Sequence, residues 1–185
     1  MATADPPAPK HVPQTIREVL DEWETDDSEW MWRSLRMTGT DNWLVDAIQN
    51  GTLCAVTDGS YIREMHPELC SAAFILECSQ TGGRLMGSFP EWSPDASAYR
   101  GEMLGLLAIH LILLAVNELH PDLDGQVVLY SDCLGAISRV ADVPESRLPA
   151  KTKHANILKV IMIHCSNFPF DIIYRHIRAH QDDWV

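Results

Sequence analysis

The feature that most restricts the fold of this sequence is one long apolar segment, 97–118, placed among short apolar runs. Leu106, Ile109 and Leu113 recur within it at intervals of three and four residues, so the spacing predicts a helix with one apolar face. The short runs predict strands at 53–60, 71–79, 84–89, 126–131 and 170–177, with shorter helices at 133–140 and 152–165. Strands that come first as hairpins and later alternate with helices predict an α/β fold, a mixed sheet with flanking helices.

The first 50 residues differ in composition from the rest of the chain. The stretch 1–13 is rich in proline, which predicts a disordered tail. Residues 14–50 form an acidic leader or connection segment that holds four of the six tryptophans. Because exposed tryptophans are uncommon, this segment is expected to be a docking surface; it either packs on the main domain or belongs to a preceding one. The main domain is expected to span 51–185.

The charge of the chain is unevenly distributed. A net charge of -12 argues against a nucleic-acid partner, because a phosphate backbone repels an acidic protein. Within 147–181 the balance reverses, with Asp171 as the single acid against six bases. The bases are Arg147, Lys151, Lys153, Lys159, Arg175 and Arg178. This segment is either a solvated helix face or a surface for phosphates.

The positions of the cysteines and the length of the longest apolar stretch indicate the cellular compartment of the protein. The five cysteines include no Cys-x-x-Cys pair and lie mostly in apolar runs, which favours reduced thiols in an intracellular protein, nuclear or cytoplasmic. The first residues lack the basic and apolar regions of a secretory signal. The longest apolar stretch, 103–116, is too short to span a bilayer, so no membrane partner is expected.

Three acids stand at the ends of predicted elements. Asp58 closes one strand, Asp132 follows another, and Glu102 lies in the opening turns of the long helix, on the face of its apolar residues. Parallel strands joined through a helix have their carboxyl ends at one edge of the sheet, which predicts that Asp58 and Asp132 are neighbours. Each acid alone is typical of a cap or turn, and Asp58-Gly59 is ordinary turn chemistry. Together they predict a site for a hard divalent cation such as Mg²⁺.

With these motifs the sequence resembles the ribonuclease H family, type 1, and within it the ribonuclease H domains of retrotransposon polyproteins. The resemblance covers roughly 53–183 and rests on Thr57-Asp58-Gly59-Ser60, Tyr99-Arg100-Gly101-Glu102, Tyr130-Ser131-Asp132 and Ile177-Arg178-Ala179-His180-Gln181-Asp182-Asp183. It implies a five-stranded mixed sheet with flanking helices. It also implies hydrolysis of the RNA strand of RNA–DNA hybrids by a carboxylate two-metal mechanism with Mg²⁺, or alternatively Mn²⁺.

The resemblance assigns roles to particular residues. It makes Asp58, Glu102 and Asp132 the first metal ligands, and His180 the histidine of a mobile loop that assists proton transfer or product departure. A lone histidine is also often structural, so both roles stay open for His180. His176 and His180 would suit zinc only on a helix, and zinc is therefore discounted. The implied partners are an RNA–DNA hybrid and a reverse transcriptase domain.

One departure from the family pattern concerns the fourth metal ligand. Family members carry a fourth acid in a C-terminal helix after the histidine loop, whereas this sequence stops at Val185. The domain is therefore expected to be truncated, with Asp182 or Asp183 as a substitute; Asp183 is taken as the predicted ligand. A site weakened in this way leaves an alternative function open, a non-catalytic ribonuclease H-like module that binds nucleic acid or packs on a polymerase.

Overall fold

The structure, a computed structural model, describes residues 11–23, 29–142, 148–149, 151–165 and 167–178. Its centre is one sheet of six strands in the order β1-β4-β3-β2-β5-β6. The strands are β1 (Arg36–Met37), β2 (Leu53–Ser60), β3 (Leu69–Cys78), β4 (Arg84–Trp92), β5 (Gln126–Ser131) and β6 (Asp171–His176). The helices are α1 (Ile16–Trp23), α2 (Asn42–Gln49), α3 (Ala98–Leu119), α4 (Leu134–Asp142) and α5 (Ala155–Cys165), with a short 3-10 helix η1 (Glu29–Met31). The predicted mixed sheet with flanking helices is confirmed.

The sheet has six strands, one more than predicted. The additional strand, β1, pairs antiparallel with β4 through Arg36 and Met37. Two residues are too few for the alternation of apolar and polar side chains by which a strand is recognised in a sequence. Pairing with β4, and not the local sequence, makes this segment a strand.

The parallel strands bring Asp58 and Asp132 to one edge of the sheet. β5 lies between β2 and β6 and runs parallel to both. Val56 on β2 pairs with Tyr130 on β5. Asp58 and Asp132 each follow this pair by two residues, so the register brings them level at the same edge. β3 and β4 continue the sheet on the other side of β2 as antiparallel neighbours.

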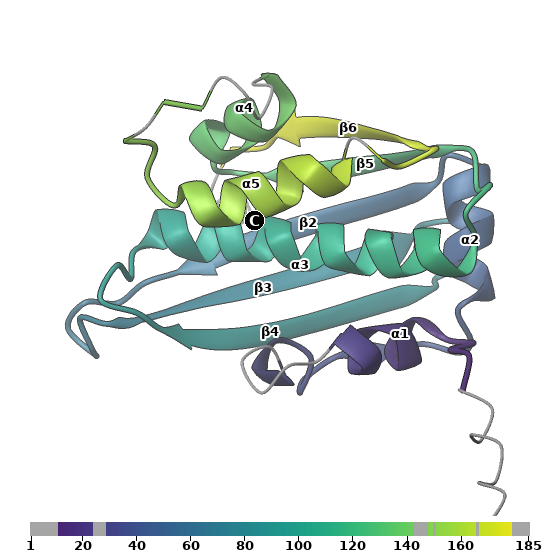
Figure 1. Ribbon diagram of the computed structural model, residues 1–185, viewed down its shortest axis with the longest axis horizontal. Coiled ribbons are helices and arrows are strands. Elements are labelled where there is room, and N and C mark those ends of the chain that lie inside the picture. The colour runs from purple at the N-terminus through teal and green to yellow at the C-terminus, as the bar shows by residue number, and fades with distance from the viewer. Residues whose placement is uncertain (1–10, 24–28, 143–147, 150, 166, 179–185) are drawn as a thin grey trace, which may run out of the picture.

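The long helix α3 packs on one face of the sheet and runs along β2 and β3 (Figure 1). The Ser97 hydroxyl caps its start and accepts a hydrogen bond from the Arg100 amide at 3.1 Å. Leu106, Ile109 and Leu113, the predicted apolar face, are fully buried. Among the described residues α3 is the one helix long and apolar enough to cross a membrane, but 67% of its most apolar stretch is buried within the domain. Burial of this kind is typical of a core helix.

The described part of the leader segment packs on the same core. On α1, Ile16, Val19 and Leu20 are buried, and the helix lies beside α3. Trp30 and Trp32 make edge-to-face contacts with the sheet, at 4.9 Å between the ring centroids of Trp30 and Phe89 and 6.2 Å between those of Trp32 and Phe74. These contacts bury apolar surface of the sheet that would otherwise face water.

Candidate metal centre

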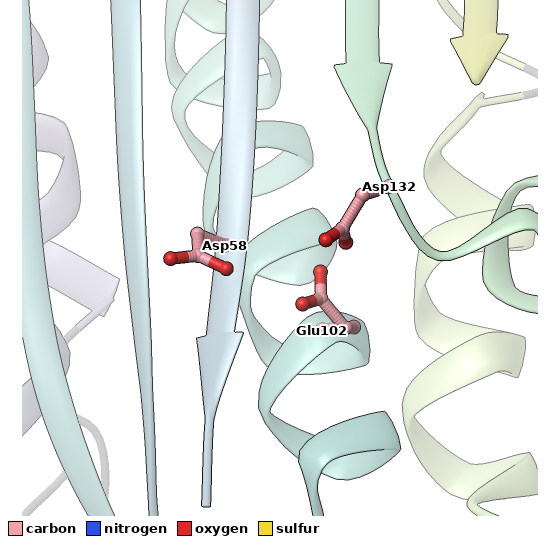
Figure 2. A group of neighbouring side chains, drawn as sticks. All are labelled: Asp58, Glu102 and Asp132. Carbon is pink, nitrogen blue, oxygen red and sulfur yellow. The ribbon is translucent and has the colours of Figure 1, made fainter. Parts of the chain in front are cut away.

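Three carboxylates meet at the edge where β2 and β5 end. Asp58 comes from β2, Glu102 from the first turns of α3 and Asp132 from the residue after β5 (Figure 2). One carboxylate oxygen of each lies within 4.8 Å of the corresponding oxygens of the other two. The three predicted acids are thus brought together by elements far apart in the sequence, at a separation that one shared cation can bridge.

Two glycines allow the close approach of α3 to β2. A Cβ on Gly59 would lie 2.3 Å from the Glu102 nitrogen, and a Cβ on Gly101 would lie 2.6 Å from the Ser71 carbonyl oxygen. Gly59 lies inside β2, and it is not among the glycines with positive φ. Asp58-Gly59 is therefore part of a strand and not the turn that the dipeptide alone would suggest. Its glycine removes the side chain that would push Glu102 away.

Glu102 is the buried member of the three acids, with 6% of its surface exposed. Its Oε1 accepts a hydrogen bond from the Gly59 amide at 2.7 Å. Its Oε2 is buried and has no hydrogen-bond partner among the described residues. Burial raises the pKa of Glu102 to about 7; the charges of Asp132 and Asp58 act in the same direction, and the Gly59 hydrogen bond acts against it.

An unpartnered carboxylate oxygen inside a protein is costly unless a proton or a cation compensates its charge. Here that oxygen belongs to a cluster of three carboxylates, which is the all-oxygen donor set that Mg²⁺ and Mn²⁺ prefer. The residues present therefore fit a hard divalent cation.

Backbone contacts hold the segment that carries Asp132. The Ser131 hydroxyl accepts a hydrogen bond from the Cys133 amide at 3.0 Å. His176 on β6 donates from Nε2 to the Asp132 carbonyl oxygen at 3.0 Å, since a carbonyl can only accept. This contact ties β6 to the loop that carries Asp132.

Basic side chains lie on the elements around this edge. Arg175 and Arg178 are exposed at the end of β6 and just beyond it, and Lys151 and Lys153 are exposed before α5. The segment before α5 reaches the start of α3, because His154 contacts Arg100. Four of the six bases therefore lie on segments that contact the segments carrying the acids, through His176 with Asp132 and through His154 with Arg100.

Three of the predicted site residues, His180, Asp182 and Asp183, lie outside the described residues. The sequence-based reasoning missed the packing role of Gly59 and Gly101. A glycine in the first turn of a predicted helix was the available signal, since glycine weakens a helix and needs a compensating reason such as close packing.

Comparison with known proteins gives matches among structures only. No protein-family model matches the sequence, and neither does any curated protein. The solution structure of the prototype foamy virus ribonuclease H domain is 18% identical, covers 70% of this chain and 81% of that chain, and has a TM-score of 0.54.

Two further structures contain nucleic acid. The foamy viral protease-reverse transcriptase in complex with an RNA/DNA hybrid is 15% identical over 71% of this chain and 18% of its own, with a TM-score of 0.52. The LC11 ribonuclease H1 from compost, also with an RNA/DNA hybrid, is 13% identical over 71% of this chain and 88% of its own, with a TM-score of 0.50. Such low identities establish the fold alone: this chain has the ribonuclease H fold that the resemblance predicted.

Proposed function

We propose that this chain is a metal-dependent endonuclease that hydrolyses the RNA strand of RNA–DNA hybrids, with Asp58, Glu102 and Asp132 as metal ligands. The observation that carries the proposal is the buried, unpartnered Oε2 of Glu102 within a cluster of three carboxylates. Mg²⁺ is the proposed cofactor, and Mn²⁺ suits the same oxygens.

Each carboxylate has a distinct part in this proposal. Asp58 is exposed and Asp132 half-buried, so these two face the side from which a substrate arrives. The Gly59 amide holds Oε1 of Glu102 by a hydrogen bond, and Oε2 of Glu102 is left for a cation. When bound, Mg²⁺ supplies an activated water and neutralises charge that develops on the phosphate and the leaving oxygen.

The substrate class follows from the charges near the site and from the fold. Arg175, Arg178, Lys151 and Lys153 are exposed near the carboxylates in a chain that is otherwise acidic, and cations of this kind hold phosphates. Two proteins of the same fold bind RNA/DNA hybrids. A hybrid is therefore the nucleic acid proposed for this chain.

Two parts of the proposal concern residues or partners that the structure does not describe. His180 is proposed to assist proton transfer or product departure, and Asp183 to be the fourth metal ligand. A reverse transcriptase domain is the proposed protein partner, since the foamy virus chain with this fold is a protease-reverse transcriptase.

Cleavage of an end-labelled hybrid with Mg²⁺ tests the proposed function. The wild-type chain is expected to cut the RNA strand, and duplex DNA of the same sequence should remain intact. Glu102→Gln should lower cleavage by about 100- to 1000-fold, whereas Glu77→Gln, which changes a half-exposed carboxylate on β3, should leave it unchanged. His180→Ala and Asp183→Asn should slow cleavage and alter its Mg²⁺ dependence.

Two outcomes would overturn the proposal. The first is equal cleavage by the wild-type chain and Glu102→Gln, which would point to a contaminating nuclease. The second is hybrid binding that persists without Mg²⁺ and never leads to cleavage, which would favour the non-catalytic binding module instead.

A further inference from the structure

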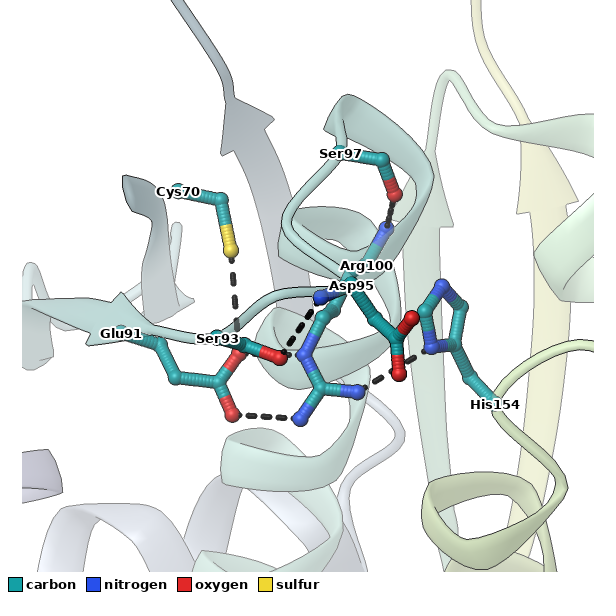
Figure 3. A network of polar contacts seen from close by, with 7 residues as sticks. All are labelled: Cys70, Glu91, Ser93, Asp95, Ser97, Arg100 and His154. Atoms are coloured by element: carbon teal, nitrogen blue, oxygen red, sulfur yellow. Dashed lines mark hydrogen bonds and ion pairs between the residues drawn. The ribbon is translucent and has the colours of Figure 1, made fainter. Parts of the chain in front are cut away.

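A buried network joins four segments of the chain next to the candidate metal centre (Figure 3). Arg100, in the first turn of α3, donates from Nε and Nη2 to the two carboxylate oxygens of Glu91 on β4, at 2.5 and 2.6 Å. Its Nη1 contacts Nδ1 of His154, the residue before α5, at 3.1 Å. Cys70 on β3 adds a weak contact to Glu91, at 3.7 Å. The segments tied together are β3, β4, α3 and the residue that precedes α5.

The hydrogen bonds of this network have fixed directions, and one buried group in it, His154 Nε2, has no partner among the described residues. Arginine can only donate, so His154 Nδ1 accepts and the imidazole is the neutral form with its proton on Nε2. The guanidinium therefore donates from Nε and Nη2 to Glu91 and from Nη1 to His154. The Arg100 and Glu91 side chains are only 12% and 14% exposed. A paired fork of this kind fixes orientation as well as distance.

Stability alone is a weak explanation for such a pair. Removing two charges from water offsets most of their attraction, and buried ion pairs are often no more stabilising than well-packed apolar residues. The position of the pair offers a better explanation. Arg100 stands two residues before Glu102, on the turn that Gly59 and Gly101 allow to touch β2. A shift of that turn would lengthen the 2.7 Å hydrogen bond from Gly59 to Glu102.

We propose that Arg100, held by Glu91 and His154, is a positioning residue that sets the place of the Glu102 carboxylate. It acts through the first turn of α3 and touches neither the cation nor the substrate. This inference rests on the proposed function for its biological meaning, but its physical content is the geometry of the three carboxylates and can be measured without turnover.

Two readouts on the intact chain test this role. The first is hydrogen exchange of the Gly59 amide in the metal-free protein, which reports the bond to Glu102. The second is Mn²⁺ affinity by titration calorimetry. Arg100→Lys keeps the charge and loses the fork, and is expected to lower Mn²⁺ affinity by about 10-fold, the lower end for residues that orient metal ligands. Gly59 exchange should become faster, while the amides of β5 stay protected.

Matched variants separate positioning from general stability. Arg84→Lys changes an arginine–glutamate pair between β4 and β3 that is half exposed, and should leave both readouts unchanged. His154→Ala should also lower Mn²⁺ affinity and speed Gly59 exchange, by less than Arg100→Lys does. His154→Gln retains an acceptor for Arg100 and should restore the wild-type values. If Arg100→Lys does not fold, the His154 pair provides the same comparison.

The proposal is overturned if Arg100→Lys leaves Gly59 exchange and Mn²⁺ affinity as in the wild type. It is equally overturned if all amides lose protection together, because the pair would then only stabilise the fold. A wild-type chain that binds Mn²⁺ but does not cleave a hybrid would contradict the proposed function. That result would leave the effect of Arg100 on Glu102 to be decided by the same two measurements.

Discussion

Helix α3 buries two ionisable side chains, Glu102 near its start and His110 two turns later, and their surroundings differ. His110 is fully buried and satisfied at both nitrogens: Nδ1 donates to the Leu106 carbonyl oxygen and Nε2 accepts from the Tyr174 hydroxyl, each at 2.6 Å. Glu102 is almost as deeply buried, yet one of its oxygens has no partner.

The difference separates a group that is satisfied within the fold from the one that we propose as a metal ligand. Burial lowers the pKa of His110 to about 4, so its neutral form completes a link between α3 and β6. Burial raises the pKa of Glu102 to about 7, and the neighbouring acids add to the shift. Burial itself is common to both. The unmet oxygen, and the acids that face it, distinguish the residue that is available for binding.

Replacement of Glu102 should have the largest effect on function and the least cost in stability. Loss of one metal ligand removes several kcal/mol of transition-state stabilisation, so Glu102→Gln is expected to lower hybrid cleavage by about 100- to 1000-fold. Its free energy of unfolding should stay equal or rise, because the variant removes a charge repelled by Asp58 and Asp132. Cleavage rates and urea unfolding on the same samples check both. A clear loss of stability would make Glu102 a structural residue like His110.

His110 should make the fold sensitive to acid. The pKa of His110 is about 4 in the folded chain and 6.5 in the unfolded one. Between pH 6.5 and 4 the imidazole is therefore protonated in the unfolded chain but neutral in the folded chain. The contribution of His110 to the free energy of unfolding is fully present above pH 6.5, and about 3 kcal/mol of it is lost as the pH falls to 4.

Urea unfolding of the wild type and of His110→Leu between pH 7 and 4 measures this contribution. The variant has no imidazole to protonate, so its stability should fall less over that range. Parallel pH profiles for the two proteins would show that His110 is not the group responsible.

The link between α3 and β6 should be measurable from the β6 side. Tyr174→Phe removes the hydroxyl that donates to His110 and leaves a buried acceptor unmet, which is expected to lower the free energy of unfolding by about 1–3 kcal/mol. Tyr130→Phe, on the adjacent strand β5, is the matched control. Specific activity per folded molecule should be unchanged in both. A Tyr174→Phe chain as stable as the wild type would mean that the 2.6 Å contact contributes little.

The contrast between the two groups also marks how far the sequence alone could lead. The spacing of Glu102 with Leu106, Ile109 and Leu113 was sufficient to place Glu102 on the sheet-facing side of α3, because helix periodicity is a local property. The order of strands was sufficient to bring Asp58 and Asp132 to one edge. Both predictions needed only local patterns and the rule for parallel strands.

Contacts between residues that are distant in the sequence could not be predicted from local patterns. Arg100 and His154 are 54 residues apart and His110 and Tyr174 are 64 apart, and no local pattern connects either pair. A buried histidine whose hydrogen bonds are complete has the same letter in the sequence as one that binds a ligand. Strand β1 was not predicted for a related reason, since it forms only by pairing with β4.

Divalent cations should stabilise the fold through Glu102 and not through general charge screening. A ligand present at about ten times its Kd adds about 1.4 kcal/mol to folding, which for a chain of this size corresponds to roughly 3–6 °C in Tm. Mg²⁺ at fixed ionic strength should therefore raise the Tm of the wild type by this amount. Glu102→Gln should show a smaller rise, and His110→Leu, although less stable at the start, should show the full one. Equal shifts in all three proteins would mean that the cation binds elsewhere on an acidic surface, because only a site that includes the unmet Glu102 oxygen can distinguish the two buried residues of α3.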